Sequence, residues 1–393
     1  MTDAAHLPPA DLLWATRDLP APLALLDGVA LEANLADLAR RADGVPIRVA
    51  TKSVRVRSVI DRALADPAFR GLMTYSLAES VWLADLGHDD ILLAYPTVNA
   101  PALRDLAAEQ HRLDAITVMV DSLDSLDAID GVLGVRHPTV KVCLDVDASL
   151  RLGPIHLGVR RSPVHSVKDA RRLAEAIARR PGFDLAGVMF YDAQIAGLPD
   201  SSPAVRLVKK RSAAELAERR SLVVAAVGAV TDLRLVNAGG TGSLEVTGAD
   251  PSITELTAGS GMFCPTLFDG YDAFEARPAA FFALDVVRRP ARGIATCFSG
   301  GYVASGPAGD SRVPTPVFPE GLSLIGTEGT GEVQTPVTGH AARQLRPGDR
   351  VLFRHAKAGE MCERFDTVAV VDAPGRGKVE THPTYRGEGK NFG

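Results

Sequence analysis

The sequence predicts an α/β protein in which a (β/α)8 barrel is followed by a second, mainly β domain. Eight short apolar runs alternate with amphipathic, helix-like segments over about 210 residues, which is the sequence pattern of this barrel. After Asp272 the alternation gives way to short β-branched runs rich in glycine and proline. A chain of 393 residues is also too long for one typical domain and fits a barrel plus a second domain.

The predicted barrel strands follow one another at regular spacing. They are the runs 47–50, 71–74, 91–94, 116–120, 140–146, 185–190, 233–236 and 254–257. Helical periodicity marks 30–41 and the segments near 54–65, 77–86, 100–109, 122–133, 166–180 and 207–230. A doubly wound sheet would alternate in the same way, but no Gly-x-Gly-x-x-Gly motif follows an early strand, which favours the barrel.

The second domain is expected to be built from five later runs and the start of the chain. These runs are 280–288, 293–298, 331–336, 350–353 and 366–371, and residues 22–26 offer a further strand. We therefore predict a barrel over 27–272, a β-rich domain over 1–26 plus 273–374, and a polar, frayed tail over 375–393.

Composition and charge exclude several classes of protein. Hydrophobic residues make up 46% and charged residues 23%, which are ordinary globular values. A net charge of −5 gives no reason to expect nucleic acid or an anionic membrane as partner. The start of the chain lacks a signal-peptide pattern and no apolar run is long enough to span a bilayer, so a cytoplasmic protein is expected. Four scattered cysteines without a CxxC pair indicate neither a disulfide framework nor a zinc knuckle.

The first barrel strand ends on a lysine, in Arg48-Val49-Ala50-Thr51-Lys52-Ser53. Barrel active sites lie at the carboxyl ends of the strands, where loss of water favours a neutral, nucleophilic amine. Most lysines at strand ends simply reach solvent. Lys52 therefore needs a partner elsewhere in the chain before the pattern has functional meaning.

Two glycine-rich turns supply that partner. Gly239-Gly240-Thr241-Gly242-Ser243 follows the seventh predicted strand, and Gly259-Ser260-Gly261 follows the eighth. These two loops often bind phosphate in barrels, because a turning backbone and a short helix N-terminus favour an anion. A phosphate anchor across the barrel mouth from a lysine indicates pyridoxal phosphate, whose aldehyde condenses with an amine.

Lys52, Tyr191, Gly240 to Ser243, Gly259-Ser260 and a final β domain occur in an order that resembles one family of pyridoxal-phosphate enzymes. It is the D-threonine aldolase and D-serine dehydratase family, relatives of alanine racemase. The resemblance covers roughly residues 20–372 and is strongest to the bacterial branch called amino acid deaminase/aldolase. It implies that Lys52 bonds to the cofactor, that Tyr191 lies beside it, and that the turns at 240–243 and 259–261 hold its phosphate.

Two departures from the family concern its other functional residues. The family has an arginine before a Gly-Val pair, facing the pyridine nitrogen, whereas this chain has His156 there and Arg151 as a competing candidate. The family's metal ligands form a His-x-Cys or His-x-Asp pair. Here the region offers Cys362 with Glu360 or His355, a possible zinc or manganese site. The alternatives are a loop histidine at 156 and a metal-free variant in which Cys362 packs and His355 makes a hydrogen bond.

The resemblance implies a lyase acting on a small D-configured β-hydroxy amino acid, either by Cα–Cβ cleavage or by dehydration and deamination. One alternative is racemisation, for which Tyr302 is the candidate acid on the second cofactor face. Another is a pyridoxal-phosphate carrier without catalysis, although such relatives lack the β domain. A homodimer is expected, because a β domain can complete a neighbour's active site.

Overall fold

The computed structural model describes residues 6–373 and 379–393, and these residues form two compact units. The barrel unit consists of Leu38–Lys52, Arg62–Gly259 and the last two residues, Phe392–Gly393. The β unit consists of the residues up to Asp37, Ser53–Asp61 and Ser260–Asn391. Each unit is described on its own below.

Eight parallel strands close the barrel, which confirms the predicted (β/α)8 architecture. The strands are β2 (Ile47–Ala50), β3 (Phe69–Thr74), β4 (Ile91–Leu93), β5 (Ile116–Val120), β6 (Val140–Asp145), β9 (Phe183–Phe190), β10 (Leu235–Ala238) and β11 (Glu255–Ala258). They follow one another around the barrel in chain order, and β11 closes onto β2 through pairs such as Leu256 with Ile47. The strands are largely buried, because each apolar run is covered by the helices that follow it.

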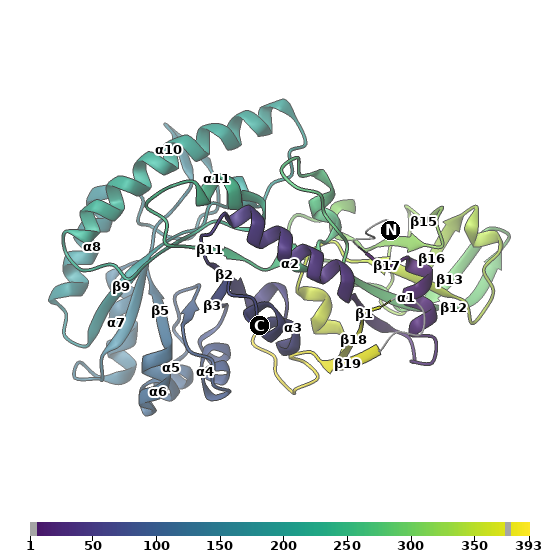
Figure 1. Cartoon of the computed structure of the whole chain (residues 1–393), viewed down its shortest axis with the longest axis horizontal. Coiled ribbons are helices and arrows are strands. Elements are labelled where there is room, and N and C mark those ends of the chain that lie inside the picture. Colours follow the sequence, from purple (N-terminus) through teal and green to yellow (C-terminus); the bar gives the residue numbers. More distant parts are fainter. Residues whose placement is uncertain (1–5, 374–378) are drawn as a thin grey trace. The chain divides into compact units, whose positions relative to one another are not determined.

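Several helices of this unit start at a residue whose side chain caps them. They are α4 (Leu77–Asp85), α5 (Ala100–Ala108), α6 (Gln110–Ala115), α7 (Leu123–Leu133), α8 (Val167–Arg179), α9 (Ala193–Ala196), α10 (Pro203–Gly228) and α11 (Leu244–Gly248). Side chains of four serines accept a backbone N–H bond at the helix start: Ser76, Ser122, Ser166 and Ser202. The long α10 packs against α8 (Figure 1). In the described part of the chain no helix is long and apolar enough to cross a membrane.

An arginine takes the place of an apolar residue on β2. Arg48 is 2% exposed, and its guanidinium binds Glu255 on β11 through two bonds of 2.7 Å and Asp90, just before β4, at 2.8 Å. Asn237 on β10 also donates to Glu255, at 2.7 Å. A buried charge of this kind is tolerated because several partners on neighbouring strands satisfy it.

The β unit contains a nine-stranded sheet, which confirms the predicted second, mainly β domain. Its strands are β1 (Leu23–Asp27), β12 (Ala280–Ala291), β13 (Ile294–Phe298), β14 (Thr315–Phe318), β15 (Leu322–Leu324), β16 (Gln334–Gly339), β17 (Arg350–Arg354), β18 (Thr367–Val371) and β19 (Val379–Pro383). β1 is an interior strand, antiparallel to β12 and parallel to β18. Helices α1 (Pro9–Ala15) and α12 (Ser260–Phe263) belong to this unit, while α2 (Gly28–Ala42) and α3 (Arg57–Leu64) each contribute residues to both.

The expectation of a frayed tail is wrong for residues 379–391, while residues 375–378 lie outside the described part of the chain. Val379–Pro383 forms β19, which pairs with β18 along five residues. Tyr385 is fully buried, and its backbone N–H donates to the Arg55 carbonyl at 2.9 Å. The guanidinium of Arg57 donates hydrogen bonds from Nε and Nη2 to the Glu388 carboxylate. Backbone pairing and one buried aromatic ring therefore order a segment whose polar composition suggested the opposite.

Candidate active site

The amine of Lys52 lies between two tyrosines at the end of β2. Lys52 belongs to a short 3-10 turn, η1 (Thr51–Ser53), that follows the strand directly. Its Nζ donates a 2.8 Å hydrogen bond to the Tyr95 hydroxyl. The same nitrogen is 5.4 Å from the ring centroid of Tyr95 and 5.9 Å from that of Tyr191. Tyr95 follows β4 and Tyr191 follows β9, so three strand ends bring these side chains together.

A second cation, Arg161, reaches the same pair of rings. Its guanidinium carbon is 5.1 Å from the ring centroid of Tyr191 and 5.5 Å from that of Tyr95. Burial alone would raise the pKa of the Tyr95 phenol, but the charges and hydrogen bonds of Lys52 and Arg161 outweigh it and lower this pKa overall. The Tyr95 hydroxyl thus accepts a hydrogen bond from Lys52 and is also close to the Arg161 guanidinium.

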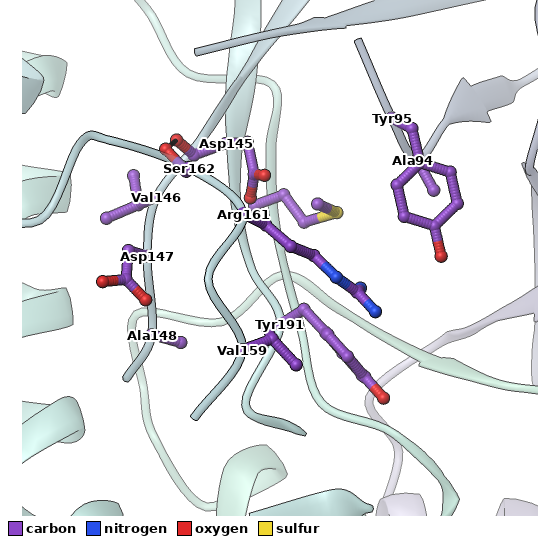
Figure 2. A pocket seen from close by; sticks show the side chains of 11 residues that line it. Ala94, Tyr95, Asp145, Val146, Asp147, Ala148, Val159, Arg161, Ser162 and Tyr191 are labelled. Atoms are coloured by element: carbon purple, nitrogen blue, oxygen red, sulfur yellow. Dashed lines mark hydrogen bonds between the residues drawn. The ribbon is translucent and has the colours of Figure 1, made fainter. Parts of the chain in front are cut away.

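Arg161 and both tyrosines line a pocket at this end of the barrel (Figure 2). The pocket is narrow: its cavity volume is about 20 Å³, little more than one water molecule requires, and part of it is open to solvent. Its lining residues are Ala94, Tyr95, Asp145, Val146, Asp147, Ala148, Val159, Arg161, Ser162, Met189 and Tyr191. Two aromatic rings, one arginine and two carboxylates therefore form its walls.

The two carboxylates of the pocket have different surroundings. Asp145, at the end of β6, is 8% exposed, and burial together with the Asp121 charge raises its pKa to about 7. Asp147 accepts bonds from the backbone and hydroxyl of Ser149 and from Arg151, and these outweigh burial and lower its pKa. Near neutral pH Asp145 is therefore the group able to hold or release a proton, while Asp147 stays ionised.

The two predicted partners of the pyridine nitrogen lie on a small hairpin outside this lining. β7 (Leu150–Leu152) and β8 (Ile155–Leu157) pair so that Arg151 lies opposite His156. Arg151 binds the Asp147 carboxylate at 2.5 Å, and the His156 ring nitrogens lie 3.5 Å from the Ser149 hydroxyl and 3.3 Å from the Val159 carbonyl. Their roles stay predictions, and Arg161 is a third candidate.

The predicted phosphate turn after β10 is compact and buried. Thr241–Ser243 forms the 3-10 turn η2, and the hydroxyl of Ser243 accepts a bond from the Gly240 N–H at 3.2 Å. A side chain at Gly240 would place its Cβ 2.8 Å from the Cβ of Ala196 and 3.8 Å from the Tyr191 ring. The backbone at 240 thus faces the tyrosine that borders Lys52. In the second turn Gly259 follows β11 directly, and Ser260 and Gly261 open α12.

The three predicted metal ligands lie in the β unit near the end of β17. His355 is 3% exposed; its Nδ1 lies 3.1 Å from the Ala280 carbonyl, and its Nε2 has no hydrogen-bond partner among the described residues. The Cys362 thiol is 1% exposed, and burial raises its pKa to about 12. Glu360 accepts a 2.9 Å bond from the backbone of Ser305. Over the described ranges, no group of three or more His, Cys, Asp or Glu side chains is arranged to hold a metal ion.

Tyr302, the candidate acid for racemisation, is part of an aromatic cluster in the β unit. Its ring lies edge-on to Phe282 and Phe365, with centroid distances of 4.9 and 5.4 Å. Its hydroxyl is 2.8 Å from the Ser299 hydroxyl. Burial raises the pKa of Tyr302, so the phenol is protonated at neutral pH.

The sequence patterns assigned no role to Tyr95 or to Arg161. The signal for Tyr95 was its place directly after a barrel strand. Arg161 comes from the long connection between β8 and α8, where no strand end marks it. Its contacts with the rings of Tyr95 and Tyr191 place it in the site, and these contacts are visible only in the structure.

Comparison with known proteins gives a family and a set of related folds. A family model for the alanine racemase N-terminal domain matches residues 26–247. D-threonine aldolase from Filomicrobium marinum has a TM-score of 0.78 at 24% identity, covering 96% of this chain and 96% of that chain. D-threo-3-hydroxyaspartate dehydratase from Delftia sp. HT23 has a TM-score of 0.71 at 20% identity, covering 93% of this chain and 97% of that chain.

Two further structures share the fold. Alanine racemase from Corynebacterium glutamicum has a TM-score of 0.58 at 14% identity, covering 84% of this chain and 88% of that chain. A cysteine-to-alanine variant of a D-threo-3-hydroxyaspartate dehydratase, in a metal-free form, has a TM-score of 0.71 at 21% identity, covering 93% of this chain and 97% of that chain. At these identities the likeness concerns the fold. A search of curated proteins finds no match.

Proposed function

Because the chain belongs to the family of the alanine racemase N-terminal domain, we propose that it is a pyridoxal-phosphate lyase acting on a small D-configured β-hydroxy amino acid. One observation carries the proposal. The amine of Lys52 is held at the end of a barrel strand by the Tyr95 hydroxyl, with the Tyr191 ring and Arg161 beside it. The similarity in fold to an aldolase and a dehydratase supports the choice of reaction class.

The residues of the barrel unit fit pyridoxal phosphate. The bound cofactor would supply an aldehyde that bonds to amines and a ring that withdraws electrons from the substrate. Lys52 would hold the aldehyde end. Gly240, whose position leaves no room for a Cβ beside Ala196, and the buried Thr241 and Ser243 would hold the phosphate. Arg161, which contacts the rings of Tyr95 and Tyr191, would supply positive charge to the bound cofactor.

The chain's own residues would then move protons around the substrate. The Lys52 amine, at the end of β2, would serve as a base or acid toward a bound substrate. Tyr95 accepts the hydrogen bond of that amine and so fixes its direction. Arg161 favours negative charge on the Tyr95 oxygen, because its charge and hydrogen bond lower the pKa of that phenol. Tyr191 forms one wall of the pocket.

Metal assistance is a separate proposal. The buried Nε2 of His355 has no hydrogen-bond partner among the residues that the structure describes, so it is available as a metal ligand. Glu360 and Cys362 follow within one short segment. The metal-free form named for a cysteine variant of a D-threo-3-hydroxyaspartate dehydratase supports a role for Cys362. Because the described residues form no three-donor group, water or substrate would have to complete the coordination shell. Elemental analysis of wild-type protein and of Cys362→Ser tests this, since a metal that binds here must be lost in the variant.

The cofactor is tested by absorption. Wild-type protein mixed with pyridoxal phosphate should become yellow, with a band that borohydride abolishes, and Lys52→Ala should lack the band. Lys141→Ala is the matched control, because Lys141 is a lysine of β6 that donates to the Asp114 carbonyl and does not line the pocket. An unchanged band in Lys52→Ala would rule out the proposed attachment.

The reaction is tested by products. D-threonine should yield an aldehyde and glycine if Cα–Cβ cleavage dominates, and D-serine should yield ammonia and an oxo acid if dehydration dominates. Cofactor binding without turnover of either would indicate the carrier function instead. Gel filtration with light scattering at several protein concentrations tests the homodimer, which we also propose.

Racemisation is the second candidate, favoured by the protonated Tyr302 and by the fold of alanine racemase. Under that function, inversion of the substrate α-carbon requires an acid on a second face of the cofactor. Tyr302→Phe should then abolish interconversion of the two enantiomers while the borohydride-sensitive band is unchanged. Full retention of interconversion in Tyr302→Phe would remove this candidate.

A further inference from the structure

A fully buried carboxylate joins two loops at the mouth of the barrel. Asp192 is 0% exposed and follows Tyr191 directly after β9. Its Oδ2 accepts a 2.6 Å bond from the hydroxyl of Thr247 on α11. Both of its oxygens lie 3.2 Å from the Ser243 hydroxyl, which ends the turn η2. One side chain that follows β9 therefore holds two hydroxyl groups, one at the end of the turn after β10 and one on the helix that follows this turn.

The Ser243 hydroxyl passes this constraint to the turn itself. Its oxygen also accepts the Gly240 N–H, at 3.2 Å. The hydroxyl has two kinds of acceptor, the Asp192 carboxylate at 3.2 Å and the Gly240 carbonyl at 3.4 Å, and the charge and shorter contacts favour Asp192. The Ser243 N–H donates to the Gly240 carbonyl at 2.9 Å, so both groups of the Ser243–Gly240 pair are joined to the carboxylate.

We propose that Asp192 is a positioning residue for a bound phosphate group: by accepting the hydroxyl protons of Ser243 and Thr247, it holds the 240–243 turn in the shape that receives the anion. The inference rests on the proposed function, which places the cofactor phosphate at this turn. An anion site built from backbone N–H groups works only if those groups converge before the ligand arrives. Asp192 supplies this preorganisation from outside the ligand's reach.

Burying the Asp192 carboxyl group costs free energy, because the group loses its contact with water. Burial raises its pKa, and the Thr247 bond, the Arg220 charge and the Ser243 bonds offset only part of that effect. Arg220 does not neutralise it directly, because its guanidinium binds Asp250 at 2.6 Å. A neutral residue that packs equally well would avoid the desolvation of a carboxyl group. A carboxyl group here accepts hydrogen bonds from the hydroxyls of Ser243 and Thr247, which an apolar side chain cannot do.

The test compares pyridoxal phosphate with pyridoxal, which lacks the phosphate. For the wild type and each variant, quenching of tryptophan fluorescence gives the dissociation constants of both ligands. The dissociation constant of pyridoxal divided by that of pyridoxal phosphate measures how much the phosphate contributes to binding. Asp192→Asn keeps the shape but offers only one acceptor, and it should lower the ratio by about tenfold. Thr247→Val should lower it by about threefold, and Thr247→Ser, which restores the hydroxyl, should leave it within about twofold of the wild type.

Asp130→Asn is the matched control. Asp130 is a largely buried aspartate that binds His137 and Arg180 on another part of the barrel unit. The ratio in this variant should equal that of the wild type. Equal losses of pyridoxal and pyridoxal phosphate affinity in Asp192→Asn, or an unchanged ratio, would overturn the inference. If Asp192→Asn does not fold, an unchanged ratio in folded Thr247→Val overturns it. Wild-type protein that fails to bind pyridoxal phosphate at all would instead refute the proposed function.

Discussion

Asp145 and Asp147 are two residues apart at the end of β6, yet only the carboxylate of Asp147 receives hydrogen bonds from described residues. Both line the same pocket beside Arg161 (Figure 2). The Asp147 carboxylate accepts bonds from Ser149 and Arg151. The negative charges of Asp121 and Asp147 act on Asp145 and raise its pKa. The two carboxyl groups therefore titrate in opposite directions from their ordinary values.

The first prediction concerns stability as a function of pH. Since the folded-state pKa of Asp145 is raised from 3.8 to about 7, its contribution to stability is present below pH 4 and is lost as the pH rises toward 7. Asp145→Asn should therefore stabilise the cofactor-free protein at pH 8, by up to about 4 kcal/mol, and have little effect at pH 4. Urea unfolding at both pH values measures the difference.

Asp147→Asn provides the opposite control. The pKa of Asp147 is lowered in the folded protein, so its ionised form stabilises the fold above the unfolded pKa, and that stability is lost as the pH falls through the folded value. This variant should destabilise the protein at pH 8 and approach the wild type in acid. Two variants that shift stability in the same direction at pH 8 would contradict the assigned environments.

The second prediction concerns the Tyr95 phenol. Lys52 and Arg161 together lower its pKa, so Lys52→Ala and Arg161→Ala should each raise it. Ultraviolet titration of tyrosinate follows the change, and subtraction of the Tyr95→Phe curve isolates this residue, which is one of six tyrosines in the chain. A Tyr95 curve that is the same in both alanine variants as in the wild type would contradict the assigned cause.

The third prediction concerns the charged network between barrel strands. Arg48→Met leaves the carboxylates of Glu255 and Asp90 without their common partner and should cost about 3–5 kcal/mol of stability. Arg234→Ala is the control, because Arg234 pairs with Asp184 at the surface and should change stability by less than about 0.5 kcal/mol. Chemical unfolding of both variants gives the comparison, and equal effects would contradict the role assigned to Arg48.

The fourth prediction concerns the end of the chain. Tyr385 is fully buried, so Tyr385→Ala should leave a cavity and destabilise the β unit by about 3–5 kcal/mol. Arg386→Ala removes an exposed pair with Asp366 and should have little effect. Limited proteolysis should show faster cleavage near residue 385 only in the first variant, and equal cleavage of both would indicate that the buried ring does not hold the segment.

Sequence patterns predict those parts of this fold in which burial is continuous. The eight barrel strands were predictable because their apolar runs are buried almost without interruption, and the capping serines mark where helices follow. The hairpin of β7 and β8 was not, since Leu152 and Ile155 are exposed and the alternation that marks a half-buried strand is absent. The ordered end of the chain was missed because one buried tyrosine carries little weight in a polar segment.

The candidate site shows the same division. Lys52 could be singled out because it ends a predicted strand. Arg161 and Asp192 could not, because their roles depend on contacts with residues far away in the sequence, the rings of Tyr95 and Tyr191 for the first and the hydroxyls of Ser243 and Thr247 for the second. Loop geometry of this kind has no local sequence period.

The position of β1 inside the sheet has a consequence for synthesis of the protein. Leu23–Asp27 is nearly free of solvent contact, but its neighbours β12 and β18 begin only at Ala280 and Thr367. A ribosome adding about 5–20 residues per second needs on the order of tens of seconds to deliver them. All eight barrel strands leave the ribosome during this interval, while an apolar segment near the N-terminus waits without a partner. We expect this segment to be what chaperones bind on the nascent chain.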